Sequence, residues 1–373
     1  MASLTSPLRI GALDLQHRVV LAPLTRNRAH ADGVPSGLAR EYYAQRASIP
    51  GTLLISEGTF ITARAGGTAH VPGIWSPAQI QQWKTITSAV HQRGSHIFCQ
   101  LWALGRAANP AILAQTGDEV TSSGNIPLTN TPTTVPRPLA EAEILDWIQD
   151  DVHAAQNAIA AGFDGVEIHG ANGYLPDQFL QDTANNRTDH WGGSFENRSR
   201  FGLEVAKAVS AAIGSSRTGY RVSPWSTFQD MRMHNFRQQF RDLVERLAPL
   251  NLAYLHVVGP RISGGQTIED TSSAAQDEML DDTFLFDAFG SSGAIILAGG
   301  FTAESAQERL QRYPVDRPVA IAFGRHFLAN PDLPFRLAKG LPLNQYDRST
   351  FYTPESAVGY VDYPFSPDLV VPV

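Results

Sequence analysis

Eight short apolar runs recur along the chain, and segments with the spacing of amphipathic helices lie between most of them. A strand is apolar over its whole length when both of its faces are covered, which is the usual condition of a parallel sheet. Parallel strands need crossover connections, and the helical segments supply them. The runs are residues 17–25, 51–58, 96–102, 163–168, 219–224, 252–258, 294–300 and 319–324. Eight such units predict a (β/α)8 TIM barrel.

An open, doubly wound sheet is the alternative to a closed barrel. Such a sheet, when it binds a dinucleotide, carries the pattern GxGxxG after its first strand. The first run here ends in Ala22-Pro23-Leu24-Thr25, without that pattern. The clearest helical segment, residues 141–161, places apolar side chains at Ile144, Ile148, Val152, Ala155 and Ile159. Helices of this kind between buried strands favour the barrel.

Two further segments frame the predicted barrel. Residues 9–16 alternate apolar and polar side chains around Gly11, which predicts a β-hairpin lid before the first strand. Residues 103–138, after the third strand, are rich in Pro, Thr, Asn and Ala and have no sustained periodicity. We expect this long excursion to cover one end of the fold, because long loops in compact domains usually carry function. We predict a single domain over residues 1–373.

The composition limits the possible partners. A net charge of -7 and a pI near 5.9 argue against nucleic acid or an anionic membrane as a partner. No apolar run is long enough to span a bilayer, and the first residues do not resemble a signal peptide. Cys99 is the single cysteine and lies in an apolar run, so we expect a buried thiol and a reducing compartment. The predicted location is the cytoplasm, for a monomer or homodimer.

A phosphate site is predicted after strands seven and eight. In this fold the chemistry gathers at the C-terminal ends of the strands, and phosphate binds after the last two. Those ends carry the pairs Gly299-Gly300 and Gly324-Arg325. Glycine lets the backbone approach an anion closely, and Arg325 adds a charged contact. A tight turn with no ligand is an equally ordinary interpretation of a Gly-Gly pair.

Other strand ends indicate what is attached to that phosphate. Gln100 offers a donor and an acceptor to a ring imide, and Arg221 places a positive charge inside the barrel mouth. Such a charge is costly unless an acceptor meets it, and a reduced flavin is negative near N1. Thr25 could bond a carbonyl oxygen on the same ring. Each residue alone is more often part of a core, but together they favour FMN over a bare sugar phosphate.

The fourth strand ends in a cluster of hydrogen-bonding side chains. His169 and Asn172 could both donate to one oxygen and polarise a carbonyl or nitro group. Tyr174 is a candidate acid, since a tyrosine is protonated at neutral pH. A buried structural hydrogen bond is the alternative for a lone His at a strand end, but three such residues in one turn favour catalysis. A metal site is disfavoured, because no second His or carboxylate stands at ligand spacing.

The chain resembles the Old Yellow Enzyme family of FMN-dependent ene-reductases, in a fungal style, from Pro7 to Phe365. The resemblance is carried by specific motifs along the whole chain. They are Ala22-Pro23-Leu24-Thr25-Arg26, Cys99-Gln100-Leu101-Trp102, His169-Gly170-Ala171-Asn172-Gly173-Tyr174-Leu175, Asn186-Arg187-Thr188-Asp189, Trp191-Gly192-Gly193-Ser194-Phe195-Glu196-Asn197-Arg198, Phe323-Gly324-Arg325 and Asn330-Pro331-Asp332-Leu333-Pro334.

The resemblance implies tightly bound FMN, reduced by NADPH, in the barrel mouth. Pro23, Leu24 and Gly58 would then lie near the ring, with Thr25, Gln100 and Arg221 in contact with it. An α,β-unsaturated aldehyde, ketone or nitroalkene would follow NADPH in a ping-pong sequence, held by His169 and Asn172 and protonated by Tyr174. The resemblance also implies pocket walls that could equally be ordinary packing residues: Trp102, Phe228, Phe351 and Tyr352.

Other functions remain open at this point. Relatives in secondary metabolism suggest isomerisation, desaturation or reductive cyclisation on the same scaffold, and a flavin-binding regulatory protein is the non-enzyme alternative. Tyr174 favours simple reduction, because it supplies the proton that completes it. The chain departs from the family in the loop of residues 227–235, which is longer in many relatives, and at Gly259, where an acidic residue is usual. Both departures affect the predicted substrate range and leave the flavin site unchanged.

Overall fold

The computed structural model describes residues 2–263, 266–267, 281–314 and 317–370. Eight parallel strands of this described part close into a barrel in the order β10-β13-β14-β3-β4-β5-β8-β9. The predicted (β/α)8 TIM barrel is therefore confirmed. The barrel strands are β3 (Val19–Leu21), β4 (Leu53–Phe60), β5 (His96–Trp102), β8 (Gly165–His169), β9 (Thr218–Val222), β10 (Tyr254–Val258), β13 (Ala294–Ala298) and β14 (Val319–Phe323).

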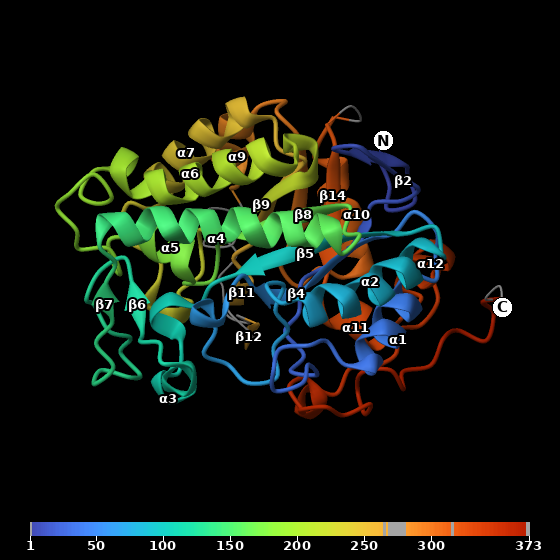
Figure 1. Ribbon diagram of the computed structural model, residues 1–373. Coiled ribbons are helices and arrows are strands. Elements are labelled where there is room, and N and C mark those ends of the chain that lie inside the picture. The colour runs from blue at the N-terminus through green and yellow to red at the C-terminus, as the bar shows by residue number, and fades with distance from the viewer. Residues whose placement is uncertain (1, 264–265, 268–280, 315–316, 371–373) are drawn as a thin grey trace.

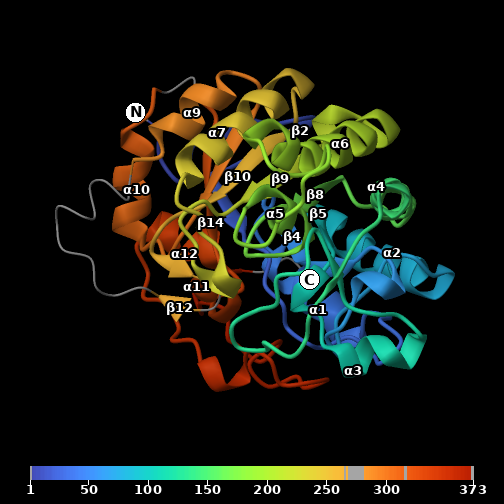
Figure 2. The ribbon, with the colours of Figure 1, turned by 90° about the vertical axis from the view of Figure 1, so that its left-hand side faces the viewer.

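Helices surround the barrel, as the end view in Figure 2 shows. Ser76 begins α2 with a capping box, in which its side chain accepts from Gln79 N, and Pro77 takes the first helical position. The covering helices are α1 (Gly37–Arg46), α2 (Pro77–His91), α4 (Glu141–Ala160), α6 (Phe195–Ile213), α7 (Phe236–Leu247), α9 (Thr283–Phe289), α10 (Ala303–Gln311) and α12 (Leu333–Lys339).

The predicted hairpin lies across the N-terminal end of the barrel. It consists of β1 (Leu8–Ile10) and β2 (Leu13–Leu15), which pair antiparallel. Gly11 at its turn has φ +55°, and a Cβ there would lie 2.1 Å from the carbonyl oxygen of Ser216, just before β9. The hairpin thus closes the end opposite to the strand tips, which point left in Figure 1.

The excursion after β5 lies at the C-terminal end of the barrel, on the left of Figure 1. It contains α3 (Pro110–Leu113) and the short parallel pair β6 (Thr121–Ser122) and β7 (Arg137–Pro138). The remaining short elements at this end are α5 (Leu175–Leu180), α11 (Arg325–Ala329), β11 (Ile262–Ser263) and β12 (Gln266–Thr267). The predicted position of the excursion is confirmed, whereas α5 was expected to be loop.

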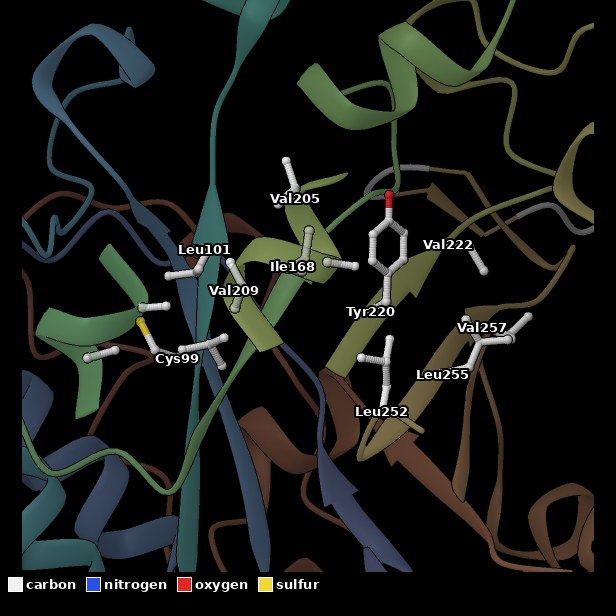
Figure 3. Packing of buried hydrophobic residues seen from close by; sticks show 14 of the residues in the cluster. Cys99, Leu101, Ile168, Val205, Val209, Tyr220, Val222, Leu252, Leu255 and Val257 are labelled. Atoms are coloured by element: carbon white, nitrogen blue, oxygen red, sulfur yellow. The ribbon is translucent and has the colours of Figure 1, made fainter. Parts of the chain in front are cut away.

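Side-chain alternation along the strands creates two cores. The outward side chains pack against the helices, and Figure 3 shows this layer, with Val205 and Val209 of α6 near Ile168 and Tyr220. Cys99 belongs to this outer layer, and burial raises the pKa of its thiol to about 12. The inert, buried thiol that the sequence predicted is therefore present.

The inward side chains form a smaller core inside the barrel. Phe98 and Tyr254 fill the part of this core nearer the N-terminal ends of the strands, with ring centroids 5.5 Å apart. Two glycines make room for them: a Cβ at Gly165 would lie 2.5 Å from Phe98, and one at Gly219 would lie 2.3 Å from Tyr254. Toward the C-terminal ends of the strands, the inward side chains beyond this aromatic layer are polar, and the cavity begins there. Within the described residues no helix combines the length and apolarity that a membrane crossing requires.

Candidate active site

A cavity of about 380 Å³ opens at the C-terminal ends of the strands. Every site residue predicted from the sequence lines it except Gly58. The predicted residues on its wall are Pro23, Leu24, Thr25, Gln100, Trp102, His169, Asn172, Tyr174, Arg221, Phe228, Gly299, Gly300, Gly324, Arg325, Phe351 and Tyr352. Chain segments that are far apart in sequence therefore meet at one site, as the barrel topology requires.

Gly58 lies inside its strand, whereas the sequence placed it at the strand end. The second apolar run was expected to end there, but β4 continues to Phe60, and its pairing with β5 shifts register between Ile55 and Gly58. A Cβ at Gly58 would lie 2.5 Å from the Trp102 ring. Gly58 therefore lies against Trp102, and the Trp102 side chain lines the cavity.

The turn after β8 directs His169 and Tyr174 to the same cavity. Asn172 and Gly173 both have positive φ, +57° and +74°, a conformation that Asn and Gly adopt most readily. Asn172 N donates to Ser223 Oγ at 2.7 Å, and Gly173 N donates to Asp177 Oδ2 at 2.8 Å. These bonds fix the turn from outside and leave the side chain of Asn172 on the cavity wall.

Three rings pack together beside this turn. Tyr174 meets Trp102 and His169 edge to face, with centroids 4.9 Å apart in both cases. Burial raises the pKa of Tyr174 above its usual value, although a hydrogen bond with the Gln229 side chain acts in the other direction. Tyr174 is therefore a neutral phenol held in one orientation.

His169 is neutral as well. Burial lowers its pKa well below the usual value, and the charges of Arg221 and His256 lower it further. Its Nδ1 is buried and has no hydrogen-bond partner among the described residues. Arg221 is 8% exposed, and its Nε also lacks a partner within the described part of the chain. Buried polar nitrogen atoms normally have hydrogen-bond partners. A polar ligand bound in the cavity could supply partners for these two atoms.

The strand ends at β13 and β14 form the part of the cavity suited to an anion. Gly299 and Gly300 have φ values of +142° and +66°, which disfavour any residue with a side chain. A Cβ at Gly299 would lie 3.3 Å from Gly259. Arg261 Nε donates to the Gly299 carbonyl at 3.0 Å. The backbone of Gly299 and Gly300 therefore faces the cavity without a side chain, beside Gly324 and Arg325.

The loop after β9 carries Phe228 to the rim, where it is 38% exposed. Gln229, Asp230 and Arg232 have φ values of +57°, +59° and +73°, a costly conformation for side-chain residues. The excursion holds the loop in place: Arg106 donates to the Gln229 carbonyl at 2.9 Å, and Thr129 N donates to the Asp230 carboxylate at 2.7 Å. The unusual loop is thus a fixed part of the wall.

The C-terminal segment completes the rim with Phe351 and Tyr352. Arg28, which is 1% exposed, donates to four carbonyl oxygens of this segment. The acceptors are Thr350 O at 2.8 Å, Phe351 O at 2.8 Å, Val358 O at 3.0 Å and Ser356 O at 3.1 Å. Arg26 also donates to Phe351 O and Gly359 O, so two buried guanidinium groups hold the segment that bears both aromatic rings.

Sequence reasoning missed several residues of the site. His326 and Tyr346 line the cavity, and Glu167 and His256 lie on the inward face of their strands beside it. The sequence did contain one indication of Glu167 and His256: each lies inside a run of apolar residues, where a charged or polar group needs a partner. Nothing in the sequence indicated that these two side chains bond to each other.

The cavity fits a flavin mononucleotide on its own chemistry. Gly299, Gly300, Gly324 and Arg325 suit a phosphate. Buried donors without partners among the described residues, Arg221 Nε and Trp102 Nε1, suit a ring with polar edges. The described residues contain no group of three or more His, Cys, Asp or Glu side chains that could hold a metal ion.

The chain is similar to known proteins over nearly its whole length. The model of the NADH:flavin oxidoreductase / NADH oxidase family matches residues 3–344. A chanoclavine-I aldehyde reductase of Penicillium roqueforti is 51% identical, with 98% of this chain and 97% of that protein covered. An NADP-dependent oxidoreductase of Aspergillus flavus is 49% identical, with 99% and 98% covered.

A solved structure with the same fold supports this assignment. The Old Yellow Enzyme homologue of Zymomonas mobilis superposes with a TM-score of 0.87 at 37% identity, covering 97% of this chain and 99% of that one. The resemblance to the Old Yellow Enzyme family is confirmed by the family match and by these relatives. The chain therefore belongs to the NADH:flavin oxidoreductase / NADH oxidase family, as an Old Yellow Enzyme-type, FMN-dependent NAD(P)H oxidoreductase.

Proposed function

We propose that this protein is an NADPH-dependent ene-reductase that acts on α,β-unsaturated aldehydes, ketones or nitroalkenes by a ping-pong mechanism. The observation that carries the proposal is the cluster of His169, Asn172 and Tyr174 on the wall of the cavity. A protein that only bound flavin would need no protonated phenol beside two potential oxygen ligands. The same cluster favours reduction over isomerisation, desaturation or reductive cyclisation.

The residues proposed to hold FMN come from most of the barrel strands. Gly299, Gly300, Gly324 and Arg325 would take the phosphate. The ring would lie on Pro23 and Leu24, in contact with Thr25, Gln100 and Arg221. The bound FMN supplies the hydride carrier between the nicotinamide and the β-carbon of the substrate.

The substrate oxygen would be held by His169 and Asn172. A neutral imidazole donates one N–H, and the Asn172 amide donates a second, so both would stabilise negative charge that develops on the oxygen. Tyr174 would deliver its proton to the α-carbon, because burial keeps the phenol protonated. Trp102, Phe228, Phe351 and Tyr352 would form the apolar walls.

The choice of reductant and substrate is also part of the proposal. The Aspergillus relative is named an NADP-dependent oxidoreductase, which supports NADPH as the reductant. The Penicillium relative is named an aldehyde reductase, which supports an unsaturated aldehyde among the substrates. A cytoplasmic location and a monomeric or homodimeric state remain predictions.

Anaerobic mixing of the reduced holoenzyme with 2-cyclohexen-1-one tests the proposal. We expect the visible absorbance of the oxidised flavin to return in a single turnover, with cyclohexanone as the product. Cyclohexanone itself is the matched control, because it has the carbonyl but no conjugated C=C bond, and it should leave the flavin reduced. If a panel of conjugated enones and enals leaves the flavin reduced, the ene-reductase proposal is wrong.

A further inference from the structure

A buried carboxylate lies inside the barrel at the level where the cavity begins. Glu167 is in β8, on the same inward face as His169, and its exposure is 0%. Its strand register places it opposite Gln100 on β5, and His169 is opposite Arg221 on β9. Glu167 therefore lies level with Gln100, and one inward-facing position before His169 and Arg221.

Two neutral side chains donate to this carboxylate. Gln100 Nε2 donates to Glu167 Oε1 at 2.8 Å, and His256 Nδ1 donates to Oε2 at 2.8 Å. Burial lowers the pKa of His256, so the imidazole is neutral at neutral pH and its contact with Glu167 is an N–H donation. Burial acts to raise the pKa of Glu167, but His256, Arg221 and Gln100 outweigh it and hold the pKa below its usual value. Glu167 is therefore a carboxylate.

The carboxylate decides how the Gln100 amide is oriented. Carboxylate oxygens only accept hydrogen bonds, so the amide must present its NH2 group to Glu167. The opposite orientation would set the amide oxygen against a buried negative charge. The Gln100 carbonyl oxygen is thereby left for the cavity, which Gln100 lines.

The same carboxylate faces the positive charge of Arg221. Their attraction raises the pKa of Arg221, against a larger opposite effect of burial. Charges inside a protein interact more strongly than in water, so Glu167 reduces the positive potential that Arg221 exerts on the cavity. A reduced flavin carries negative charge near N1. With Glu167 beside Arg221, the site would therefore stabilise reduced flavin less strongly than it would if Arg221 were the only charge there.

We propose that Glu167 is a positioning residue of the flavin site, which orients the Gln100 amide and offsets the Arg221 charge, and thereby sets the relative affinity of the site for reduced and oxidised FMN. The inference rests on the occupation of the cavity by FMN. It does not depend on the identity of the unsaturated substrate.

The test is the flavin midpoint potential of the Glu167→Gln holoenzyme, measured by equilibration with a reference dye in the absence of substrate. Removal of the negative charge should favour reduced FMN over oxidised FMN by about tenfold, which for a two-electron couple raises the potential by about 30 mV. Glu167→Asp keeps the charge and should return the potential toward that of the wild type. A folded Glu167→Gln protein with the wild-type potential would overturn the inference.

A matched control separates this effect from loss of stability. Asp332 is also 0% exposed and pairs with Arg336 at 2.7 Å, and it does not line the cavity. Asp332→Asn should lower the melting temperature and leave the potential unchanged. A shift in both variants would mean that the potential reports general destabilisation, which also overturns the inference.

A second variant keeps the inference testable if Glu167→Gln does not fold. His256→Leu removes one donor from the carboxylate and leaves Arg221, Tyr254 and Gln100 around it. The pKa of Glu167 should then rise, so the potential of the variant should increase more steeply than that of the wild type as the pH falls. Identical pH dependence in the two proteins would contradict the proposed role. Because no substrate is used, failure of enone reduction and failure of this inference are separate results.

Discussion

Burial determines the protonation of the two catalytic candidates that titrate. The pKa of His169 is lowered well below its usual value of about 6.5, and the pKa of Tyr174 is raised above its usual value of about 10. Both groups therefore keep one protonation state across the neutral range. We expect the rate of flavin reoxidation by an enone to be constant between about pH 6.5 and pH 9.

Stopped-flow measurements at saturating enone across this pH range check the expectation. The reductive half-reaction serves as the control for effects of pH on the flavin itself. A loss of rate centred near the ordinary pKa of histidine would show that His169 titrates, and would contradict a neutral imidazole as the donor to the substrate oxygen.

Among the elements, β4 supports the cavity through its bulge. Gly58 leaves room for Trp102, whose ring packs against Tyr174. In Gly58→Ala the new methyl group would lie 2.5 Å from the Trp102 ring and force it to move. We expect destabilisation by about 1–3 kcal/mol and a higher KM for the enone, since Trp102 also lines the cavity.

Urea unfolding and steady-state kinetics measure these two effects. Gly37→Ala at the start of α1 is the matched control, because a Cβ there has no heavy atom within 4 Å among the described neighbours. Gly37→Ala should leave KM unchanged and should not destabilise the protein, because alanine is favoured over glycine in a helix. Wild-type kinetics in Gly58→Ala would mean that the Trp102 position does not matter to the substrate.

The C-terminal segment is a second element, held by the buried side chains of Arg28 and Arg26. Arg28 donates to four of its carbonyl oxygens, and Arg28→Ala would leave these partly buried acceptors without that donor. We expect a loss of about 3 kcal/mol or more in the free energy of unfolding. The KM for the enone should rise, because the segment carries Phe351 and Tyr352 to the cavity rim.

Arg64→Ala provides the comparison for this variant. Arg64 pairs with Asp150 at 2.6 Å and lies over the Trp147 ring, away from the cavity residues. Its removal should cost less stability and leave KM unchanged. If Arg28→Ala lowers stability without altering KM, the segment has no part in substrate binding.

For the whole molecule, a buried acid in α4 makes stability depend on pH. Asp151 is 7% exposed, and burial, with a smaller contribution from Asp150, raises its pKa to about 8. An unfolded aspartate loses its proton near pH ~4, so between about pH 4 and pH 8 the folded state binds more protons. Stability contributed by this group therefore falls as the pH rises through that range.

Asp151→Asn keeps the neutral, uncharged form at every pH. We expect the variant to lose less stability than the wild type between pH 5 and pH 8, by at most about 1.4 kcal/mol per pH unit. Melting temperatures at these two pH values measure the difference. Parallel losses in both proteins would show that Asp151 ionises normally in the folded state.

The barrel could be predicted because each strand is buried on both faces and so appears as a continuous apolar run. The site could be predicted because parallel strands bring their C-terminal ends together, as His169, Arg221 and Gly300 illustrate. The short helix α5 could not, since all six of its residues are buried and show no amphipathic period. The end of the second strand was placed two residues early, because the register shift in β4 depends on pairing with β5. The bond between Glu167 and His256 joins residues 89 positions apart, and the sequence has no local signal for it.

The two half-reactions of Tyr174→Phe test the central claim most directly. Phenylalanine keeps the ring contacts with Trp102 and His169 and removes only the hydroxyl group. Anaerobic stopped-flow should show that reduction of the flavin by NADPH is nearly unchanged, whereas reoxidation by 2-cyclohexen-1-one slows by about 10²-fold or more. Equal loss in the two half-reactions, or no loss in either, would contradict the account of this cavity as a site where Tyr174 protonates the substrate.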